Sequence, residues 1–163
     1  MEPAIGAGRS VLDRTTLQAL LGFRTRIAYS VLVGWYDAYI GRVSGLREEE
    51  FSVLSLLDAN DDVTPKQLSR SLGISPPNLA VVIARLEVAG LVVRRASPDD
   101  RRSYRIEATR KAKTLTKRAL EAAREMEADL MRNWTEVERV ALIGLLEKLS
   151  GTLPDTTNET RQA

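Results

Sequence analysis

The most constraining feature of the sequence is a pair of helix-start signals eleven residues apart. Thr64-Pro65-Lys66-Gln67 places an N-cap threonine before a proline at the first helical position, with a glutamine that completes a capping box. Gly73 can end this short helix with a positive φ, and Ser75-Pro76 starts a second helix that Gly90 ends about four turns later. Two helices joined in this way have the spacing of a helix-turn-helix.

The second of these helices has one apolar face and one face of mostly small side chains. Its apolar residues follow the i, i+3, i+4, i+7 spacing of a stripe that faces a core: Leu79, Val82, Ile83 and Leu86. Small side chains on the opposite face would let the helix lie close to a partner, and this face carries Pro77, Asn78, Ala80, Val81, Ala84 and Arg85.

Two short strands are expected directly after Gly90. Residues 91–95 and 103–107 have strand composition, and Ser97-Pro98-Asp99-Asp100 between them has the composition of a turn. Arg101 and Arg102 follow that turn. A hairpin with two arginines at its tip, directly after a helix-turn-helix, is typical of the wing of a winged helix.

Long helical patterns flank this unit on both sides. The first runs from Asp13 to about Val43 without a proline, longer than the roughly 8 to 20 residues of most globular helices. So long an apolar stripe finds too little partner surface in a small monomer, so we expect it to pack on a second subunit. A further helix is expected from 109 to 134, and another begins at Thr135, which forms a capping box. The apolar residues that this last helix is expected to bury are Val137, Ala141, Leu142, Leu145, Leu146 and Leu149.

The predicted fold is mainly α with a small β-hairpin wing: a winged helix-turn-helix that forms an intertwined dimer through its N- and C-terminal helices. Five segments follow from this prediction. They are a flexible tail at 1–10, a dimerisation helix at 11–45, a DNA-binding lobe at 46–108, C-terminal dimerisation helices at 109–150 and a second tail at 151–163.

The 163 residues include no histidine and no cysteine. Their absence excludes every kind of site that needs a histidine or a cysteine. These are imidazole acid/base catalysis, Ser/His and Cys/His nucleophiles, thiolate or imidazole metal sites and disulfides. A carboxylate pair or an all-carboxylate metal site is formally possible, but no convincing spacing exists for either. Helix-start electrostatics explains Glu48, Glu49 and Glu50 better than a catalytic acid cluster does. We expect no enzyme, no metal and no cofactor.

Charge is nearly balanced over the chain, with a net of +2, but unevenly distributed. Between Arg85 and Arg118 there are eleven basic and four acidic residues, a net of +7, so the rest of the chain carries −5. Such asymmetry is typical of a segment that binds a polyanion, although a solvated helix face and a basic hairpin would give the same count. No run approaches the ~18 apolar residues of a membrane span, and the N-terminus lacks a signal pattern, so a cytoplasmic protein without membrane contact is expected.

The order of these elements and several short motifs resemble the MarR family of winged-helix transcription regulators. The resemblance covers the whole chain apart from the tails. Its most specific part is Asp100-Arg101-Arg102 at a fixed distance before Ala108-Thr109, where family members usually have Leu-Thr. The other matching motifs are Gly45-Leu46-Arg47-Glu48-Glu49-Glu50-Phe51, residues 68–75 and residues 86–92.

This resemblance implies a homodimer whose first and last helices interlock and whose two lobes bind a pseudo-palindromic operator in double-stranded DNA. The two recognition helices would enter successive major grooves about one helical turn apart. Arg102 would enter the adjacent minor groove, and Asp100 would orient Arg102 or Arg85 unless it serves only as an Asx-turn residue. The expected DNA contacts are Ser75, Pro76, Pro77, Asn78, Ala80, Val81, Arg85, Asp100, Arg101 and Arg102.

One departure from the family pattern affects how this chain would recognise a base sequence. Ala80-Val81 occupies positions where many members carry Thr-Arg or a similar polar pair. Without those donors direct reading of guanine is limited, although Asn78 could pair with adenine. Apolar contacts to thymine methyl groups are open to Pro77, Ala80 and Val81. We therefore expect specificity to depend on DNA shape and on the wing more than on hydrogen bonds to bases.

Members of the family respond to phenolic or aromatic acids, to cysteine oxidation or to zinc. The composition excludes the oxidation mechanism and removes the usual zinc ligands, which leaves an organic ligand or none. By the resemblance, an arginine clamping a carboxylate and an aromatic ring stacking on the ligand would lie between dimer helices and lobe. The candidates are Arg24, Arg26, Trp35, Tyr36 and Tyr39; alternatively these aromatics form the dimer interface and the arginines are solvated.

The function expected from the sequence is that of a sequence-specific DNA-binding regulator, a repressor released by a small phenolic or aromatic acid. Two alternatives remain open. One is a non-sensing DNA-binding regulator or activator on the same fold. The other is a winged-helix module that binds proteins, for which the basic segment would be incidental.

Overall fold

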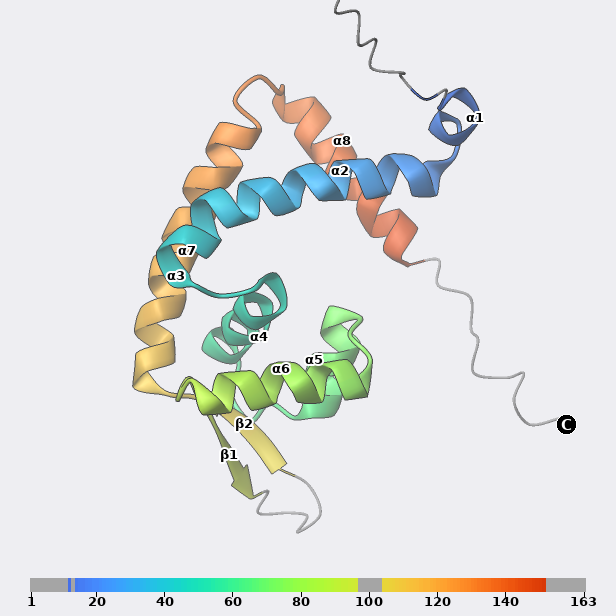
Figure 1. Cartoon of the computed structure of the whole chain (residues 1–163). Coiled ribbons are helices and arrows are strands. Elements are labelled where there is room, and N and C mark those ends of the chain that lie inside the picture. Colours follow the sequence, from blue (N-terminus) through green and yellow to red (C-terminus); the bar gives the residue numbers. More distant parts are fainter. Residues whose placement is uncertain (1–11, 13, 97–103, 152–163) are drawn as a thin grey trace, which may run out of the picture.

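The computed structural model describes residues 12, 14–96 and 104–151 of the chain. Helices make up most of it, and the two strands form one antiparallel hairpin, which confirms the predicted mainly α fold with a small β-hairpin. The elements in chain order (Figure 1) are α1 (Thr15–Gln18), α2 (Leu21–Tyr36), the π-helical segment η1 (Asp37–Gly41), α3 (Arg42–Ser44), α4 (Glu48–Ala59), α5 (Pro65–Leu72), α6 (Pro76–Val88), β1 (Val92–Ala96), β2 (Tyr104–Ala108), α7 (Arg110–Leu130) and α8 (Glu136–Ser150).

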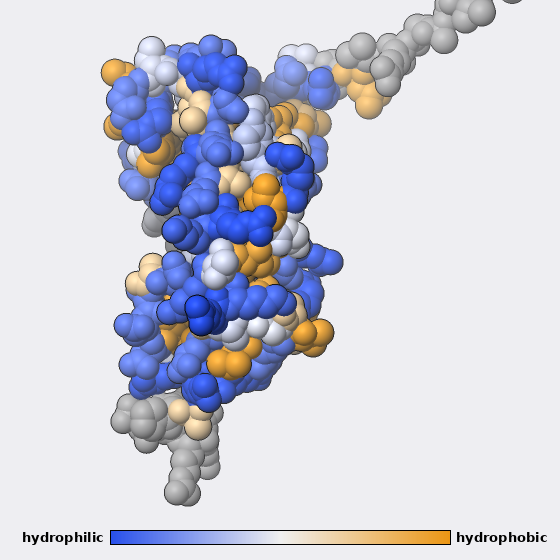
Figure 2. Space-filling view, turned by 90° about the vertical axis from the view of Figure 1, so that its left-hand side faces the viewer, coloured by the Kyte–Doolittle hydropathy of each residue, from blue (hydrophilic) through white to orange (hydrophobic). Residues whose placement is uncertain are grey.

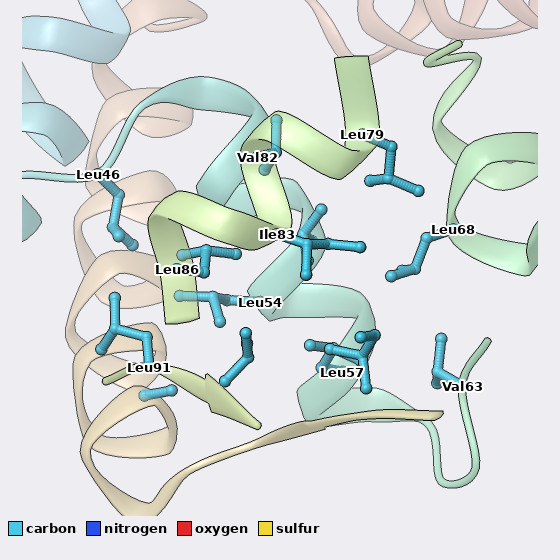
Figure 3. Close-up of a cluster of buried hydrophobic side chains, with 14 residues drawn as sticks. Leu46, Leu54, Leu57, Val63, Leu68, Leu79, Val82, Ile83, Leu86 and Leu91 are labelled. Atoms are coloured by element: carbon cyan, nitrogen blue, oxygen red, sulfur yellow. The ribbon is translucent and has the colours of Figure 1, made fainter. Parts of the chain in front are cut away.

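Helices α4, α5 and α6 and the hairpin surround one hydrophobic core. Figure 3 shows apolar side chains of these elements pointing toward one another, with Ile83 of α6 near its centre. Leu54 of α4 is fully buried, and Leu68 of α5 is only 1% exposed. The four residues predicted for the core face of α6 are all buried: Leu79, Val82, Ile83 and Leu86. The lobe therefore encloses a core of its own.

The predicted helix starts and stops of the helix-turn-helix are confirmed, with one exception. Thr64 Oγ1 accepts a hydrogen bond from the Gln67 N–H (3.3 Å), and Gln67 Oε1 accepts one from the Thr64 N–H (2.8 Å). Gly73 ends α5 with φ +63°. Ser75 takes the N-cap position of α6 and Pro76 begins the helix, but the Ser75 side chain makes no capping hydrogen bond.

The hairpin is aligned from Val92 opposite Ala108 to Ala96 opposite Tyr104. The Ile106 N–H donates to the Val63 carbonyl (2.8 Å), which attaches β2 to the loop before α5. This bond joins the hairpin to the helix-turn-helix as one lobe. The turn at 97–100 and the predicted wing arginines Arg101 and Arg102 lie outside the described residues, as do the predicted tails except Gly151.

The prediction of one uninterrupted helix from Asp13 to Val43 is wrong in two places. Leu20 is extended, with ψ 127°, so α1 ends before α2 begins. Farther along, η1 widens the helix, and Gly45 ends α3 with φ +68°. Tyr36 and Ile40 of this stretch are buried in a second cluster, against α7. Apolar spacing did not reveal the interruption, because the residues on both sides of Leu20 have helical composition.

Helices α2 and α8 lie at one end of the lobe and the hairpin at the opposite end, and α7 runs along the lobe between the two ends (Figure 1). Helix α7 ends at Leu130, four residues before the predicted end. Helix α8 begins after the N-cap Thr135 as predicted, and one chain alone buries none of its residues. Burial of its apolar face was predicted for a dimer, and it stays a prediction. Among the described residues, no helix is long and apolar enough to cross a membrane.

Candidate nucleic-acid interface

The residues of α6 that were predicted to contact DNA lie on the exposed side of the helix. The buried stripe of α6 fixes the helix on the lobe, so this opposite side must face outward. Val81 is 54% exposed. Also exposed at the N-cap and in the first turns are Ser75, Pro76, Pro77, Asn78 and Ala80. Because these side chains are short, the backbone of α6 could come close to the floor of a DNA groove.

A shallow groove of about 550 Å³ runs along one side of α6. The start of α4 and the turn before α6 form its other walls. Four of the residues that line it, Ser75, Asn78, Val81 and Arg85, were predicted to contact DNA. The other lining residues were not predicted: Arg47, Glu49, Gly73, Ile74 and Val82. Arg47 and Glu49 were missed because they are far from α6 in the chain, and no local pattern links them to it.

Arg85 is held by a carboxylate of another helix. Its Nε donates to Glu50 Oε1 at 2.8 Å, and the second oxygen of Glu50 accepts the Arg47 N–H at 3.0 Å. The Glu50 side chain is 11% exposed and that of Arg85 35%. The sequence had suggested Asp100 as a partner of Arg85 or Arg102; the structure pairs Arg85 with Glu50, and Asp100 lies outside the described residues.

Part of the basic segment is neutralised within the protein. Arg94 pairs with Glu87 at 2.8 Å, and its guanidinium lies 4.7 Å from the centroid of the Tyr104 ring. Similar pairs join Arg95 to Glu107 at 3.4 Å and Arg105 to Asp62. Glu87 and Glu107 are already counted in the net charge of +7, so only Asp62 and Glu50, which lie outside the segment, lower the charge that it presents. Exposed pairs such as Arg95–Glu107 contribute only about 0–1 kcal/mol, so a phosphate could replace the carboxylate.

The aromatic residues predicted to line a ligand site have partners within the chain. The buried Tyr36 hydroxyl donates to the Leu46 carbonyl (3.1 Å), and burial raises the pKa of Tyr36 far above its ordinary value. The Tyr39 hydroxyl donates to Asp129 Oδ2 (2.5 Å), which raises the pKa of Tyr39 and lowers that of Asp129. Trp35 stacks on Tyr39, with ring centroids 5.5 Å apart.

The two arginines predicted for the same site lie elsewhere on α2. Arg24 and Arg26 are exposed, and the Arg26 guanidinium lies 5.7 Å from the Phe23 ring centroid. At about 1.5 Å per residue, Arg26 is more than 10 Å from Trp35 along the helix. The structure thus brings the three aromatics together but leaves both arginines apart from them. In the part of the chain that the structure describes, no cluster of acidic side chains could hold a metal ion.

Comparison with known proteins agrees with this architecture. A match to the MarR family covers residues 44–103, which include the helix-turn-helix and β1. An HTH-type transcriptional repressor of Mycobacterium tuberculosis is 30% identical over 105 residues, covering 64% of this chain and 76% of the repressor. The chain belongs to the MarR family. Its predicted resemblance to these winged-helix transcriptional regulators is confirmed.

Among solved structures, this MarR-family regulator is similar to one repressor in two complexes, one with DNA and one with a small molecule. The transcriptional repressor CouR bound to a 23-mer DNA duplex matches with a TM-score of 0.78 and 32% identity, covering 86% of this chain and 99% of CouR. CouR bound to p-coumaroyl-CoA matches with a TM-score of 0.80 and 28% identity, covering 88% of this chain and all of CouR.

Proposed function

We propose that this MarR-family regulator binds a pseudo-palindromic operator as a homodimer and represses transcription until a small aromatic acid, or its thioester, releases it. The observation that carries the DNA-binding part is the exposed face of α6, which is built from short side chains and held outward by a complete core on the other side. CouR, which shares this fold at 32% identity, is known in a complex with a DNA duplex.

In the proposed complex, α6 enters the major groove and the β1–β2 hairpin lies over the adjacent minor groove. A two-fold axis between the lobes would separate the two α6 helices by about 34 Å, one turn of the duplex. Arg102, which the sequence predicts for the wing tip, would supply the minor-groove contact, together with Arg101 and Asp100. Arg85 would complete the contacts of α6.

The apolar side chains that one chain leaves exposed support the homodimer. Monomeric proteins rarely expose contiguous apolar patches larger than a few hundred Å². Here the two terminal regions expose large apolar residues: Leu12, Leu17, Leu20, Leu21, Ile27, Val31 and Leu32 from the N-terminal side, and Val137, Val140, Ile143, Leu145, Leu146 and Leu149 from α8. Interlocking of the α1–α2 region and α8 with a second copy would cover both.

The stacked rings of Trp35 and Tyr39 support the effector part of the proposal. They offer an aromatic surface beside the buried Tyr36, at the junction of α2 with the lobe. Because Arg24 and Arg26 are distant within one chain, they would reach a ligand only if the partner subunit brings them there. CouR has been solved with p-coumaroyl-CoA, an aromatic acid thioester.

DNA binding is tested with duplexes that the wild-type protein selects from a randomised 24-base-pair library, followed by fluorescence anisotropy. We expect an enriched palindrome, two chains per duplex and a steep fall in affinity with salt concentration. No enrichment together with salt-independent behaviour would favour the protein-binding module. Within the wing and α6, Arg102→Ala is expected to lower discrimination between sites more than Val81→Ala does; equal losses would contradict the expected division between shape and direct readout.

Effector release is tested by titrating the protein–DNA complex with phenolic acids and their CoA thioesters, p-coumaroyl-CoA included. A ligand can release DNA only if it binds better to a dimer whose lobes are misplaced for adjacent grooves. We therefore expect at least one compound to lower operator affinity, and Trp35→Ala to weaken that response. If no compound has an effect, the protein is a non-sensing regulator.

A further inference from the structure

We propose that Glu50 is a positioning residue that fixes Arg85 on α6 and thereby sets how well the protein distinguishes its operator from other DNA. The proposal rests on the proposed function, because it concerns how α6 meets an operator. It assigns a role in specificity to a carboxylate that belongs to another helix and carries the same sign of charge as DNA.

The geometry places Glu50 between two elements. One oxygen accepts the Arg47 N–H (3.0 Å), which fixes the carboxylate relative to the first turn of α4. The other accepts Nε of Arg85 (2.8 Å), which fixes the guanidinium relative to α6. Such charge-assisted bonds are stronger than neutral ones, and Glu50 is only 11% exposed, so solvent screens this pair weakly. Four N–H donors on the terminal nitrogens of Arg85 remain for DNA.

The turn that carries Glu50 is itself attached to α2. The Tyr36 hydroxyl donates to the Leu46 carbonyl (3.1 Å), and the Tyr29 hydroxyl donates to Glu48 Oε2 (2.7 Å). Helix α4 lies between α2 and α6 (Figure 1). A continuous series of bonds therefore runs from α2, through the start of α4, to Arg85. In a dimer held together by α2, this series would set Arg85 relative to the two-fold axis.

The direction of the change in operator affinity shows whether Glu50 acts by positioning Arg85 or only through its own charge. Removing a carboxylate near DNA weakens electrostatic repulsion, so on charge alone Glu50→Gln should raise affinity for every duplex. If Glu50 positions Arg85, the same substitution should raise affinity for unrelated DNA but lower it for the operator. Loss of one charge-assisted bond predicts a fall of about tenfold in the ratio of the two affinities.

The experiment measures anisotropy with the duplex selected by the wild-type protein and with a scrambled duplex of the same composition. Glu49→Gln is the matched control, since Glu49 is an exposed neighbour that lines the same groove. It should raise both affinities and leave their ratio unchanged. Glu50→Asp keeps the charge but shortens the side chain, so it should lower the ratio as well. Thermal melting of each variant shows whether it is folded.

A second comparison separates Arg85 from the other partner of Glu50. In an Arg85→Gln background, Glu50→Gln should cause no further loss in the affinity ratio. If the loss persists there, Glu50 acts through the Arg47 N–H alone and the proposal is overturned; an unchanged ratio for Glu50→Gln in the wild-type background overturns it too. If the wild-type protein prefers no duplex at all, the proposed function fails instead.

Discussion

The DNA-binding lobe and the terminal helices differ in how far one chain completes their packing. In the lobe, Val53 and Leu54 are fully buried, and Ile83 is 1% exposed. In α8, Leu145 is 65% exposed and no residue is buried. On the α7 side, Figure 2 shows apolar residues as separate patches within a mainly hydrophilic surface. The lobe has a closed core, to which α7 adds Ala112, whereas α8 leaves its apolar side chains exposed.

This contrast suggests that the lobe and the terminal helices have different roles. A lobe with a complete core can move as a rigid body, which suits an element that must keep α6 in one orientation. If the terminal helices pack on a second copy, as proposed, the separation of the two lobes is a property of the dimer. An effector bound near α2 would then change DNA binding by moving lobes, not by unfolding them.

The largest effect is expected for Leu145→Lys in α8. If α8 packs on a second copy, each dimer buries two unpaired ammonium groups, and each costs several kcal/mol, so dimerisation should weaken by more than about a hundredfold. Analytical ultracentrifugation over a range of concentrations measures this. Glu147→Lys is the control, because it places the same group about 200° around the helix. Equal behaviour of both variants would show that α8 is no interface.

The next effect is expected in the lobe, for Ile83→Ala. Ile83 is 1% exposed at the centre of the core (Figure 3), so truncation should lower the free energy of unfolding by about 2–5 kcal/mol. Val88→Ala in the same helix is the control, since Val88 is 92% exposed and its truncation should change stability by less than about 0.5 kcal/mol. Far-UV circular dichroism in urea measures both; similar losses would contradict the packing contrast.

The parts of this molecule that the sequence predicts well are those with local signals. Thr64 and Gly73 delimit α5 because a cap bond and a positive φ involve neighbouring residues only. The break at Leu20 and the π-helical segment at 37–41 carry no such signal. Ile40 of the π-helical segment packs against α7, a contact with a distant part of the chain that no spacing rule anticipates.

The candidate site divides in the same way. The exposed and buried faces of α6 follow from periodicity, and the structure confirms both. The partner of Arg85 could not be predicted, because Glu50 lies 35 residues away and its triplet has a sufficient local explanation at a helix start. Likewise, nothing in the sequence shows that the hydroxyls of Tyr36 and Tyr39 are already bonded within the chain.

A smaller effect is expected where the two regions meet, for Tyr36→Phe. The substitution removes a buried hydroxyl and leaves the Leu46 carbonyl without that donor, which should cost about 1–3 kcal/mol. Tyr29→Phe removes an exposed bond to Glu48 and should cost less than about 1 kcal/mol. Urea titration compares the two. If Tyr29→Phe lowers the free energy of unfolding more than Tyr36→Phe does, burial does not determine how much each hydroxyl stabilises this junction.

The smallest effect on stability is expected at the start of α8, where no residue is buried and local hydrogen bonds hold the first turn. Glu138 accepts hydrogen bonds from the N–H and the hydroxyl of Thr135, both at 2.8 Å, and these bonds lower the pKa of Glu138. A carboxyl whose pKa is lower in the folded state stabilises the fold above its unfolded pKa of about 4.3 and loses that contribution as the pH falls through the folded value.

Glu138→Gln should therefore lower the thermal midpoint slightly at pH 7, and the difference from wild type should close as the pH falls below about 4. Glu121→Gln, an exposed carboxylate of α7, is the control and should give no such convergence. A gap for Glu138→Gln that stays constant from pH 7 to pH 3 would mean that the ionised carboxylate is not what starts α8. The hydrogen bonds from Thr135, which an amide oxygen can also accept, would then matter more than the charge, and the start of α8 would not depend on pH.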